Sequence, residues 1–212
     1  MGKIKLIIFD LDGTLIDAYR AIEKSFNHVM RAMGLKTQTP ETIRRLVGWG
    51  DMNLIKPYLA PADLKQGLRL YRKHHKSSLL KYARLYPAAR SLLKDLKMRG
   101  YQLAVASNRP SRFSRILLKH LKIRGFFDYV LCADQARRPK PHPEMLNRIV
   151  NRLCFKKTQA FYVGDMAIDA CAGRAAGIKT IIISGGSSSR AEIKKEKPFK
   201  VISALGDLKK LL

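Results

Sequence analysis

Short hydrophobic runs alternate with longer amphipathic stretches at the beginning of the chain and throughout its second half. The runs expected to be strands are residues 4–9, 102–106, 129–132, 161–163, 180–183 and 200–202. The stretches with a helical period between them are residues 87–100, 111–123, 143–153 and 167–176, and a closing helix is expected after the last strand. Buried strands that alternate with helices indicate βαβ units. The pattern therefore predicts an α/β fold with a doubly wound parallel sheet whose faces are covered by helices.

Residues 17–82 differ from the rest, because they show helical periodicity and contain no convincing strand. A first helix is expected over residues 17–34, a second helix follows, and further helix is expected from about residue 52 to 82. We therefore expect an α/β core made of residues 1–16 and 83–212, with an all-helical insertion after the first strand.

The composition is typical of a globular chain. The 212 residues are 46% hydrophobic, which is enough to bury a sizeable core. No stretch reaches the roughly 18 consecutive apolar residues of a membrane helix, and the N-terminal residues lack the layout of a signal peptide. Cys132, Cys154 and Cys171 have no metal-ligand spacing and fit a reducing compartment. We expect a cytoplasmic protein with no membrane partner.

The chain is strongly basic, with 42 Lys and Arg against 16 Asp and Glu and a formal charge of +26. Such a surface attracts anions, and it can bind nucleic acid without sequence specificity. The cations and rings that would make a polynucleotide-binding face on one helix are Arg69, Tyr71, Arg72, Lys73, Lys76 and Tyr82. The sequence contains no nucleic-acid-binding motif. A basic polyanion-binding protein nevertheless stays open as an alternative.

Polar residues gather where the predicted strands end. They are Asp10, Asp12, Thr14, Ser107, Asn108, Asp165 and Asp169, with Lys140 in a stiff, proline-rich segment. Parallel strands place their carboxyl ends at one edge of the sheet, so these residues are expected to meet there. Asp10 directly follows an apolar run, where an ionised group is costly unless it is paired. Acids that converge without a cation repel one another. The sequence therefore predicts a bound cation at this edge.

Together these residues form a set of motifs that resembles a known family. The motifs are Asp10-Leu11-Asp12-Gly13-Thr14-Leu15, Ser107-Asn108, Lys140-Pro141 and Gly164-Asp165-Met166-Ala167-Ile168-Asp169. Their order, spacing and strand context resemble the haloacid dehalogenase superfamily of phosphohydrolases, over essentially the whole chain. The helical insertion is similar to the cap of its phosphoglycolate-phosphatase-like members. The resemblance implies a Rossmann-like core and a Mg²⁺-dependent hydrolase that cleaves a small phosphomonoester through an aspartyl-phosphate.

The resemblance also implies roles for individual residues. Asp10 would be the nucleophile, and Asp12 would protonate the leaving oxygen and then activate water. Lys140 would offset negative charge on the nucleophile and on the phosphoryl group. Mg²⁺ would be held by Asp10, Asp165 and the backbone carbonyl of Asp12, with support from Asp169. The expected substrate-binding residues are Thr14, Ser107, Asn108 and, in the helical insertion, Trp49.

An alternative enzyme function also stays open. An acid at Asp12 favours phosphate-ester chemistry over carbon–halogen cleavage, but sugar phosphomutases share all of these motifs. Those enzymes tend to carry basic residues in the cap loop that faces the site, and residues 48–53 contain none.

Two further expectations are structural. His74 and His75 point apart on a helix and are expected at the surface. The serine-rich residues 184–189 are expected to be a plain connector.

Overall fold

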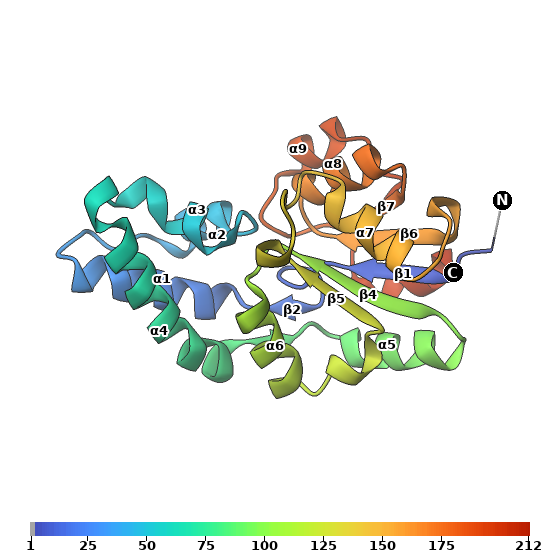
Figure 1. The fold of residues 1–212 in the computed structure, drawn as a ribbon, viewed down its shortest axis with the longest axis horizontal. Coiled ribbons are helices and arrows are strands. Elements are labelled where there is room, and N and C mark those ends of the chain that lie inside the picture. The colour runs from blue at the N-terminus through green and yellow to red at the C-terminus, as the bar shows by residue number, and fades with distance from the viewer. Residues whose placement is uncertain (1–2) are drawn as a thin grey trace.

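The computed structural model describes residues 3–212, and within them a six-stranded parallel sheet forms the centre of the molecule (Figure 1). In their order across the sheet, the strands are β5 (Tyr129–Cys132), β4 (Gln102–Ser107), β1 (Leu6–Phe9), β6 (Ala160–Gly164), β7 (Lys179–Ile183) and β8 (Lys200–Ile202). β1 lies between β4 and β6. The strand order therefore runs in opposite directions on the two sides of β1, and ligands bind at such switch points. The predicted doubly wound parallel sheet is confirmed.

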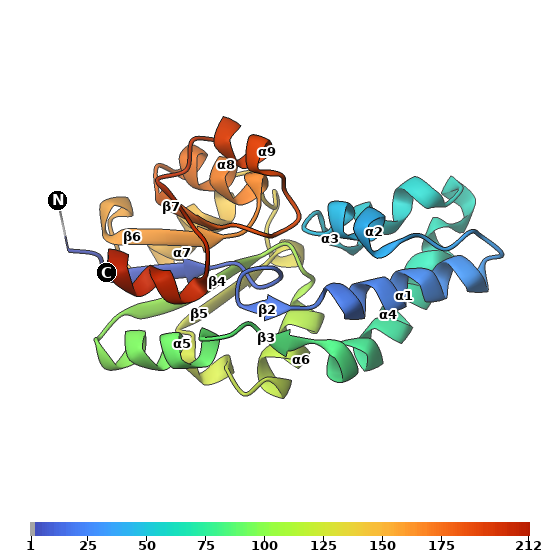
Figure 2. The same cartoon turned by 180° about the vertical axis from the view of Figure 1, so that it is seen from behind.

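Helices cover both faces of this sheet (Figures 1 and 2). They are α5 (Ala89–Met98), α6 (Ser111–His120), α7 (Glu144–Arg152) and α8 (Ala167–Ala176). Ile7 and Phe9 of β1 belong to the hydrophobic core that includes the buried sides of α5 and α6. Leu6 and Ile8 belong to the core formed with α7 and α8. Burial on both faces explains why the strands are continuous apolar runs in the sequence.

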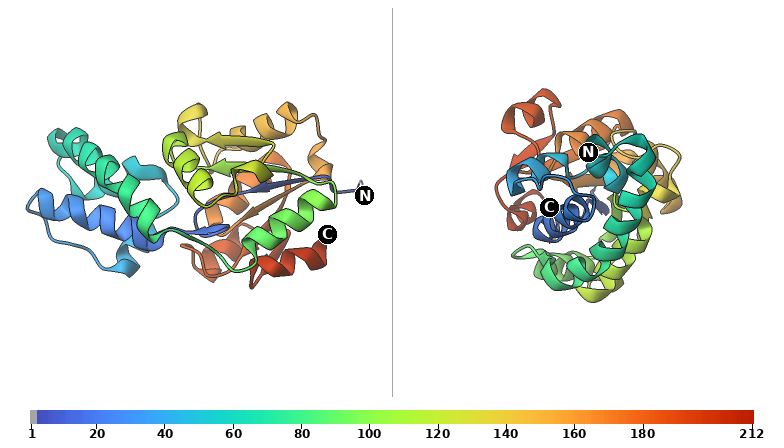
Figure 3. Two further views of the ribbon diagram at one scale, coloured as in Figure 1. Left: turned by 90° about the horizontal axis from the view of Figure 1, so that it is seen from below. Right: turned by 90° about the vertical axis from the view of Figure 1, so that its left-hand side faces the viewer.

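Four helices lie together at one end of the molecule (Figures 1 and 3). They are α1 (Tyr19–Ala32), α2 (Pro40–Leu46), α3 (Gly50–Ile55) and α4 (Leu64–Tyr82), with 3₁₀ turns at Lys56–Tyr58 and Pro61–Asp63. We call residues 17–82 the helical lobe. Two short antiparallel strands, β2 (Ile16–Asp17) and β3 (Arg84–Leu85), pair where the chain leaves the sheet region and where it returns.

The short strands β2 and β3 were not expected, and two further elements differ from the sequence prediction. The closing segment, Leu205–Leu211, is a 3₁₀ helix, the tighter form that is common in short pieces. Helix α9 (Arg190–Lys195) was not expected. Its start is fixed by a capping box, in which Ser189 Oγ accepts from the Glu192 N–H at 3.3 Å and Glu192 Oε2 accepts from the Ser189 N–H at 2.6 Å. The Ser-x-x-Glu signal is present in the sequence, at the end of a serine-rich stretch.

Over residues 3–212, none of the helices combines the length and the apolar character needed to cross a bilayer. The three cysteines in this part of the chain are free: Cys132 is buried, Cys171 is half-buried and Cys154 is exposed.

Candidate active site

The candidate site lies at the carboxyl ends of β1, β4 and β6. Asp10 follows β1, Ser107 is the last residue of β4, and Asp165 follows β6. The backbone N–H of Asp10 donates to the carbonyl of Val163 at 2.9 Å, which extends the pairing of β1 with β6. The chain then turns at Gly13, whose φ of 80° lies in the left-handed region that favours glycine. This turn keeps the residues that follow β1 at the edge of the sheet.

Three buried carboxylates converge at this edge. Asp10, Asp165 and Asp169 each offer a carboxylate oxygen, and these oxygens lie within 4.8 Å of one another. The three residues are 5%, 0% and 0% exposed. The structure thus brings together the acids that the sequence places after two different strands. Carboxylate oxygens are ligands that Mg²⁺ prefers.

Lys140 is the buried cation of this cluster. Its Nζ lies 3.0 Å from Asp10 Oδ1 and 2.8 Å from Asp169 Oδ1, and it donates to the Tyr162 hydroxyl at 2.8 Å. Burial alone would lower the pKa of Lys140, but the charges of Asp10 and Asp169 raise it above its ordinary value, so the ammonium stays charged. One ammonium does not balance three carboxylates.

Protein donors occupy both oxygens of Asp169. Its Oδ1 accepts from Lys140 Nζ and, at 2.6 Å, from the Tyr162 hydroxyl. Its Oδ2 accepts from the backbone N–H groups of Asp165 at 3.3 Å and Met166 at 3.0 Å. Asp169 therefore orients the lysine and the loop after β6, and Asp10 and Asp165 are the better candidates for direct contact with a cation.

Two glycines make room for the Asp165 carboxylate. A Cβ added at Gly13 or at Gly186 would collide with its side chain. Thr14 Oγ1 donates to Oδ1 of Asp165 at 3.1 Å, and the Tyr19 hydroxyl donates to Oδ2 at 3.4 Å. The loops after β1 and β7 thus close around this acid.

Burial disfavours the ionised forms of two of the acids. Burial raises the pKa of Asp10 to about 7, with Lys140 opposing the shift and Asp169 adding to it. The pKa of Asp165 is raised well above its ordinary value by burial and by the charges of Asp169 and Asp10. Among residues 3–212, Asp10 Oδ1 has no well-aligned hydrogen-bond donor, although Lys140 forms an ion pair with it. Buried carboxylates that lack compensating charge fit a divalent-cation site.

Ser107 and Asn108 follow β4 at the same edge. The Ser107 hydroxyl oxygen accepts from the backbone N–H of Arg109 at 3.3 Å. The Asn108 side-chain amide donates to the carbonyls of Gly48 and Lys140, both at 2.9 Å, and its oxygen accepts from the Lys140 N–H at 3.0 Å. Asn108 therefore ties the lysine segment and the helical lobe to the end of β4, and any contact that it makes with an anion falls to its backbone.

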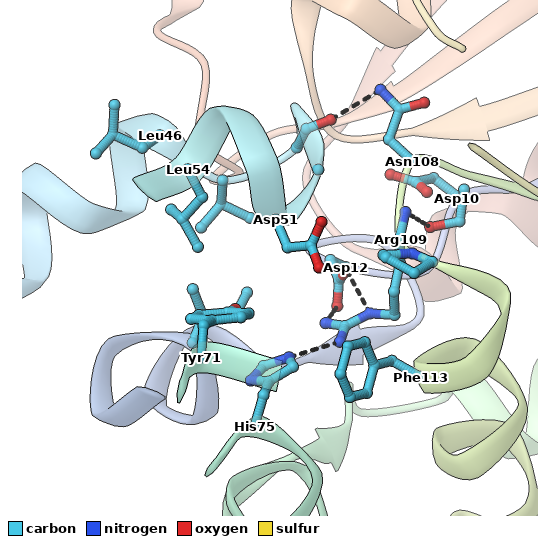
Figure 4. A pocket seen from close by; sticks show the side chains of 16 residues that line it. Asp10, Asp12, Leu46, Asp51, Leu54, Tyr71, His75, Asn108, Arg109 and Phe113 are labelled. Carbon is cyan, nitrogen blue, oxygen red and sulfur yellow. Dashed lines mark hydrogen bonds and ion pairs between the residues drawn. The ribbon is translucent and has the colours of Figure 1, made fainter. Parts of the chain in front are cut away.

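A small pocket lies between the helical lobe and the sheet edge, beside Asp10 (Figure 4). Its lining residues include Asp10, Asp12, Ser107, Asn108, Arg109 and Phe113 from the sheet side and Ile22, Leu46, Asp51, Leu54, Tyr71 and His75 from the helical lobe. The pocket thus joins the predicted nucleophile to a largely apolar wall contributed by the lobe.

Arg109 is a site residue that sequence reasoning missed. Its Nε and Nη2 donate to the two carboxylate oxygens of Asp12 at 2.9 and 2.6 Å, and its Nη1 lies 2.9 Å from His75 Nε2 (Figure 4). Its sequence signal is its place directly after Ser107-Asn108, at the end of a strand. In a chain with 42 Lys and Arg, one further arginine does not stand out.

Two residues of the helical lobe lie elsewhere than expected. The expectation that His75 is at the surface is wrong, because it is 2% exposed and stacks on Tyr71 on the buried side of α4. Trp49 is 44% exposed, and the structure does not bring it into the pocket beside Asp10. It lines a neighbouring groove with Arg72 and Arg112. A substrate contact for Trp49 therefore stays a prediction.

Comparisons with known proteins agree with this arrangement. The model of the Haloacid dehalogenase-like hydrolase family matches residues 7–183. The chain is 30% identical to a phosphoglycolate phosphatase of Aquifex aeolicus (strain VF5), over 99% of this chain and 97% of that protein. It is 31% identical to a phosphoglycolate phosphatase of Pseudomonas syringae pv. syringae (strain B728a), over 100% of this chain and 80% of that protein. The crystal structure of a predicted phosphoglycolate phosphatase from Haemophilus somnus 129pt has a TM-score of 0.93 at 26% identity and covers 100% of this chain and 99% of its own. The chain therefore belongs to the haloacid dehalogenase-like hydrolases, among the phosphatases of that family.

Proposed function

We propose that this protein is a Mg²⁺-dependent phosphomonoester hydrolase that acts on a small phosphorylated metabolite through an aspartyl-phosphate intermediate. The observation that carries the proposal is the convergence of Asp10, Asp165 and Asp169 with Lys140 at the carboxyl edge of the sheet. Membership of the hydrolase family supports it.

In this proposal Mg²⁺ is held by Asp10, Asp165 and the backbone carbonyl of Asp12, and Asp169 keeps the surrounding loop in place. The unbalanced buried charge of the acids supports a divalent ion there. When bound, the ion offsets the negative charge of the phosphoryl oxygens.

The side chains supply the bond-making steps. A carboxylate oxygen of Asp10 attacks phosphorus, the ester P–O bond breaks, and Asp12 gives its proton to the departing alcohol oxygen. Asp12 then takes a proton from water, whose oxygen attacks phosphorus and releases inorganic phosphate and Asp10. Lys140 stays charged beside Asp10 and offsets the charge that develops. The helical lobe, which forms one wall of the pocket, limits the access of bulk water.

The substrate class follows from the lining of the pocket and from the relatives. The pocket beside Asp10 is small and has a largely apolar wall, which suits a short ester. Two relatives bear the name phosphoglycolate phosphatase, so we propose 2-phosphoglycolate as the first substrate to test. We also propose that the protein acts in the cytoplasm, which its free cysteines support.

The decisive experiment is a phosphate-release assay on wild-type protein and Asp10→Asn, with Mg²⁺ and with EDTA. Wild-type hydrolysis is expected only with Mg²⁺, and Asp10→Asn is expected to lose nearly all of it while staying folded. Asp63→Asn, at an exposed acid of the helical lobe, is the matched control. An unchanged rate in Asp10→Asn would exclude Asp10 as the nucleophile. An isomerised sugar phosphate in place of inorganic phosphate would assign the site to the mutase alternative.

A further inference from the structure

Arg109 is the one lysine or arginine among the described residues that line the pocket beside Asp10. The apolar side chains around it are Ile22, Leu46, Val47, Leu54 and Phe113. Asp51 also lines the pocket, but Arg72 Nε donates to its carboxylate at 2.7 Å and offsets its charge. A second charged group on a bound ester therefore meets a single pocket cation, and that cation is Arg109.

A neutral histidine, His75, accepts a hydrogen bond from Arg109. Ser25 Oγ donates to the Ala21 carbonyl at 2.9 Å, so it accepts from His75 Nδ1–H at 3.0 Å. His75 Nε2 then has a lone pair that accepts from Arg109 Nη1 at 2.9 Å. Burial and the charge of Arg109 lower the pKa of His75 well below its ordinary value, which agrees with this neutral form. His75 therefore accepts one N–H of the guanidinium without neutralising its charge, and Nε and Nη2 face Asp12.

Arg109 occupies both oxygens of the acid that the proposed reaction needs. The two side chains are 5% and 14% exposed, and the contact is bidentate. A carboxylic acid that protonates a leaving oxygen must carry the proton on one oxygen and present it to the ester. In the bidentate pair, both oxygens of Asp12 accept N–H bonds instead. The acid step therefore requires the guanidinium to release at least one of them.

We propose that Arg109 recognises a second anionic group of the substrate and, by moving onto that group, frees Asp12 for proton transfer. The inference rests on the proposed phosphatase function and narrows its substrates to short phosphomonoesters with a carboxylate or a second phosphate near the ester oxygen. A planar guanidinium pairs with either group through two parallel N–H bonds. An ester without such a group leaves Arg109 on Asp12, so specificity and catalysis are coupled.

The test compares esters that differ in this one group. Phosphate release with Mg²⁺ is measured for 2-phosphoglycolate, for the bisphosphate of ethane-1,2-diol and for ethyl phosphate. Wild-type kcat/KM is expected to favour at least one of the two doubly anionic esters over ethyl phosphate by roughly 10- to 100-fold, the scale of a charge-assisted contact. The ranking of these two esters tells a carboxylate from a phosphate as the preferred group.

Two variants of the arginine separate recognition from a structural role. In Arg109→Gln the preference is expected to disappear, and kcat on ethyl phosphate is expected to rise because Asp12 is no longer held. Arg109→Lys keeps the charge but not the two parallel N–H groups, so its preference is expected to lie between those of Arg109→Gln and the wild type. Arg112→Gln, at the exposed arginine three residues further on, is the matched control and is expected to keep the wild-type preference.

The outcomes are distinguishable. A folded Arg109→Gln that slows every ester by the same factor would overturn the proposal, because the arginine would then only position Asp12. Equal wild-type rates on all three esters would also overturn it, and this arm requires no variant to fold. If the wild-type protein released phosphate from none of the esters, the proposed function itself would be contradicted.

Discussion

Buried charge is the main physical feature of the site at the scale of single residues. Asp10, Asp165 and Asp169 are buried beside one lysine, and burial and mutual repulsion disfavour the ionised forms of the first two. A divalent cation relieves both effects, because it attracts every carboxylate at once. Active sites commonly hold such locally unfavourable arrangements. The metal-free protein is therefore expected to be less stable than its packing alone would make it.

Asp165→Asn is expected to stabilise the metal-free protein and to abolish Mg²⁺-dependent hydrolysis. Because burial raises the pKa of Asp165 above 3.8, the folded state binds this proton more tightly than the unfolded chain does. The cost of ionising it grows as the pH rises, so the gain from Asn is expected to be larger at about pH 8 than at about pH 5. Thermal unfolding in EDTA measures the gain, at about 2–4 °C in Tm per kcal/mol.

The effect of Mg²⁺ on thermal unfolding is the control for this prediction. Mg²⁺ is expected to raise the Tm of the wild type and not that of Asp165→Asn. Asp63→Asn changes an exposed acid and is expected to leave both results unchanged. Two results would contradict the interpretation of Asp165 as a destabilising buried acid that binds Mg²⁺. One is a wild-type Tm that Mg²⁺ does not change, and the other is a Tm of Asp165→Asn below that of the wild type in EDTA at the higher pH.

Position relative to a strand end decided which site residues the sequence could predict. Asp10, Ser107 and Asp165 follow or end buried strands, and a parallel sheet brings such ends together, so local pattern and topology sufficed. The contact between Arg109 and His75 joins residues 34 apart, on the sheet side and on α4. This contact depends on how the helical lobe packs against the core, and the local pattern of hydrophobic residues does not predict that packing.

At the scale of elements, helix α2 of the lobe contacts the loop between β7 and α9. Arg44 donates to a backbone carbonyl of this loop. Arg45 donates to the Ser187 carbonyl at 3.0 Å and pairs with Glu192 through both of its Nη atoms, at 3.2 and 2.9 Å. The serine-rich residues 184–189, expected to be a plain connector, therefore also link the helical lobe to the sheet side near the site.

The Arg45–Glu192 pair is expected to affect substrate binding more than stability. Its side chains are 55% and 46% exposed, so water and salt screen the attraction. Arg45→Ala and Glu192→Gln are each expected to raise KM for the phosphate ester by about two- to fivefold at low salt, because the lobe is then held less closely. Steady-state kinetics at low and high salt measure the effect, which high salt is expected to reduce.

A double-variant cycle isolates the pair. Glu192→Gln is expected to add no further change in an Arg45→Ala background, because its partner is already gone. Lys210→Ala, which breaks the exposed pair with Asp207 near the end of the chain, is the control and is expected to leave KM unchanged. Changes in KM that simply add would show that the two side chains act independently.

At the scale of the whole molecule, the formal charge of +26 surrounds a site whose own acids are buried. The face of cations and rings considered for a polynucleotide does not form as expected. Tyr71 is 2% exposed, and Arg72 pairs with Asp51 at 2.7 Å. Of the two rings expected to stack on bases, Tyr71 is therefore not accessible. We therefore expect the charge to act mainly by long-range attraction of a small anion toward the pocket.

This attraction predicts how the reaction responds to salt. Raising KCl from about 50 to about 200 mM is expected to lower kcat/KM for 2-phosphoglycolate and to leave kcat unchanged, because screening weakens the approach of the anion and not the chemistry. Replacing Lys65, Arg69 and Lys73, exposed cations that line a groove along α4, with Gln is expected to make the salt dependence less steep.

The matched control removes the same charge from the opposite end of the sheet. Lys156, Lys157 and Lys200 are exposed near the amino ends of β6 and β8, so their replacement with Gln is expected to change the salt dependence less. Equal effects of the two triple variants would mean that net charge alone matters and that the groove along α4 has no special part. A single-stranded polynucleotide added at physiological salt is expected not to inhibit phosphate release. Strong inhibition that weakens steeply with salt would instead show that the basic surface binds a polynucleotide, and the phosphatase activity would then be secondary.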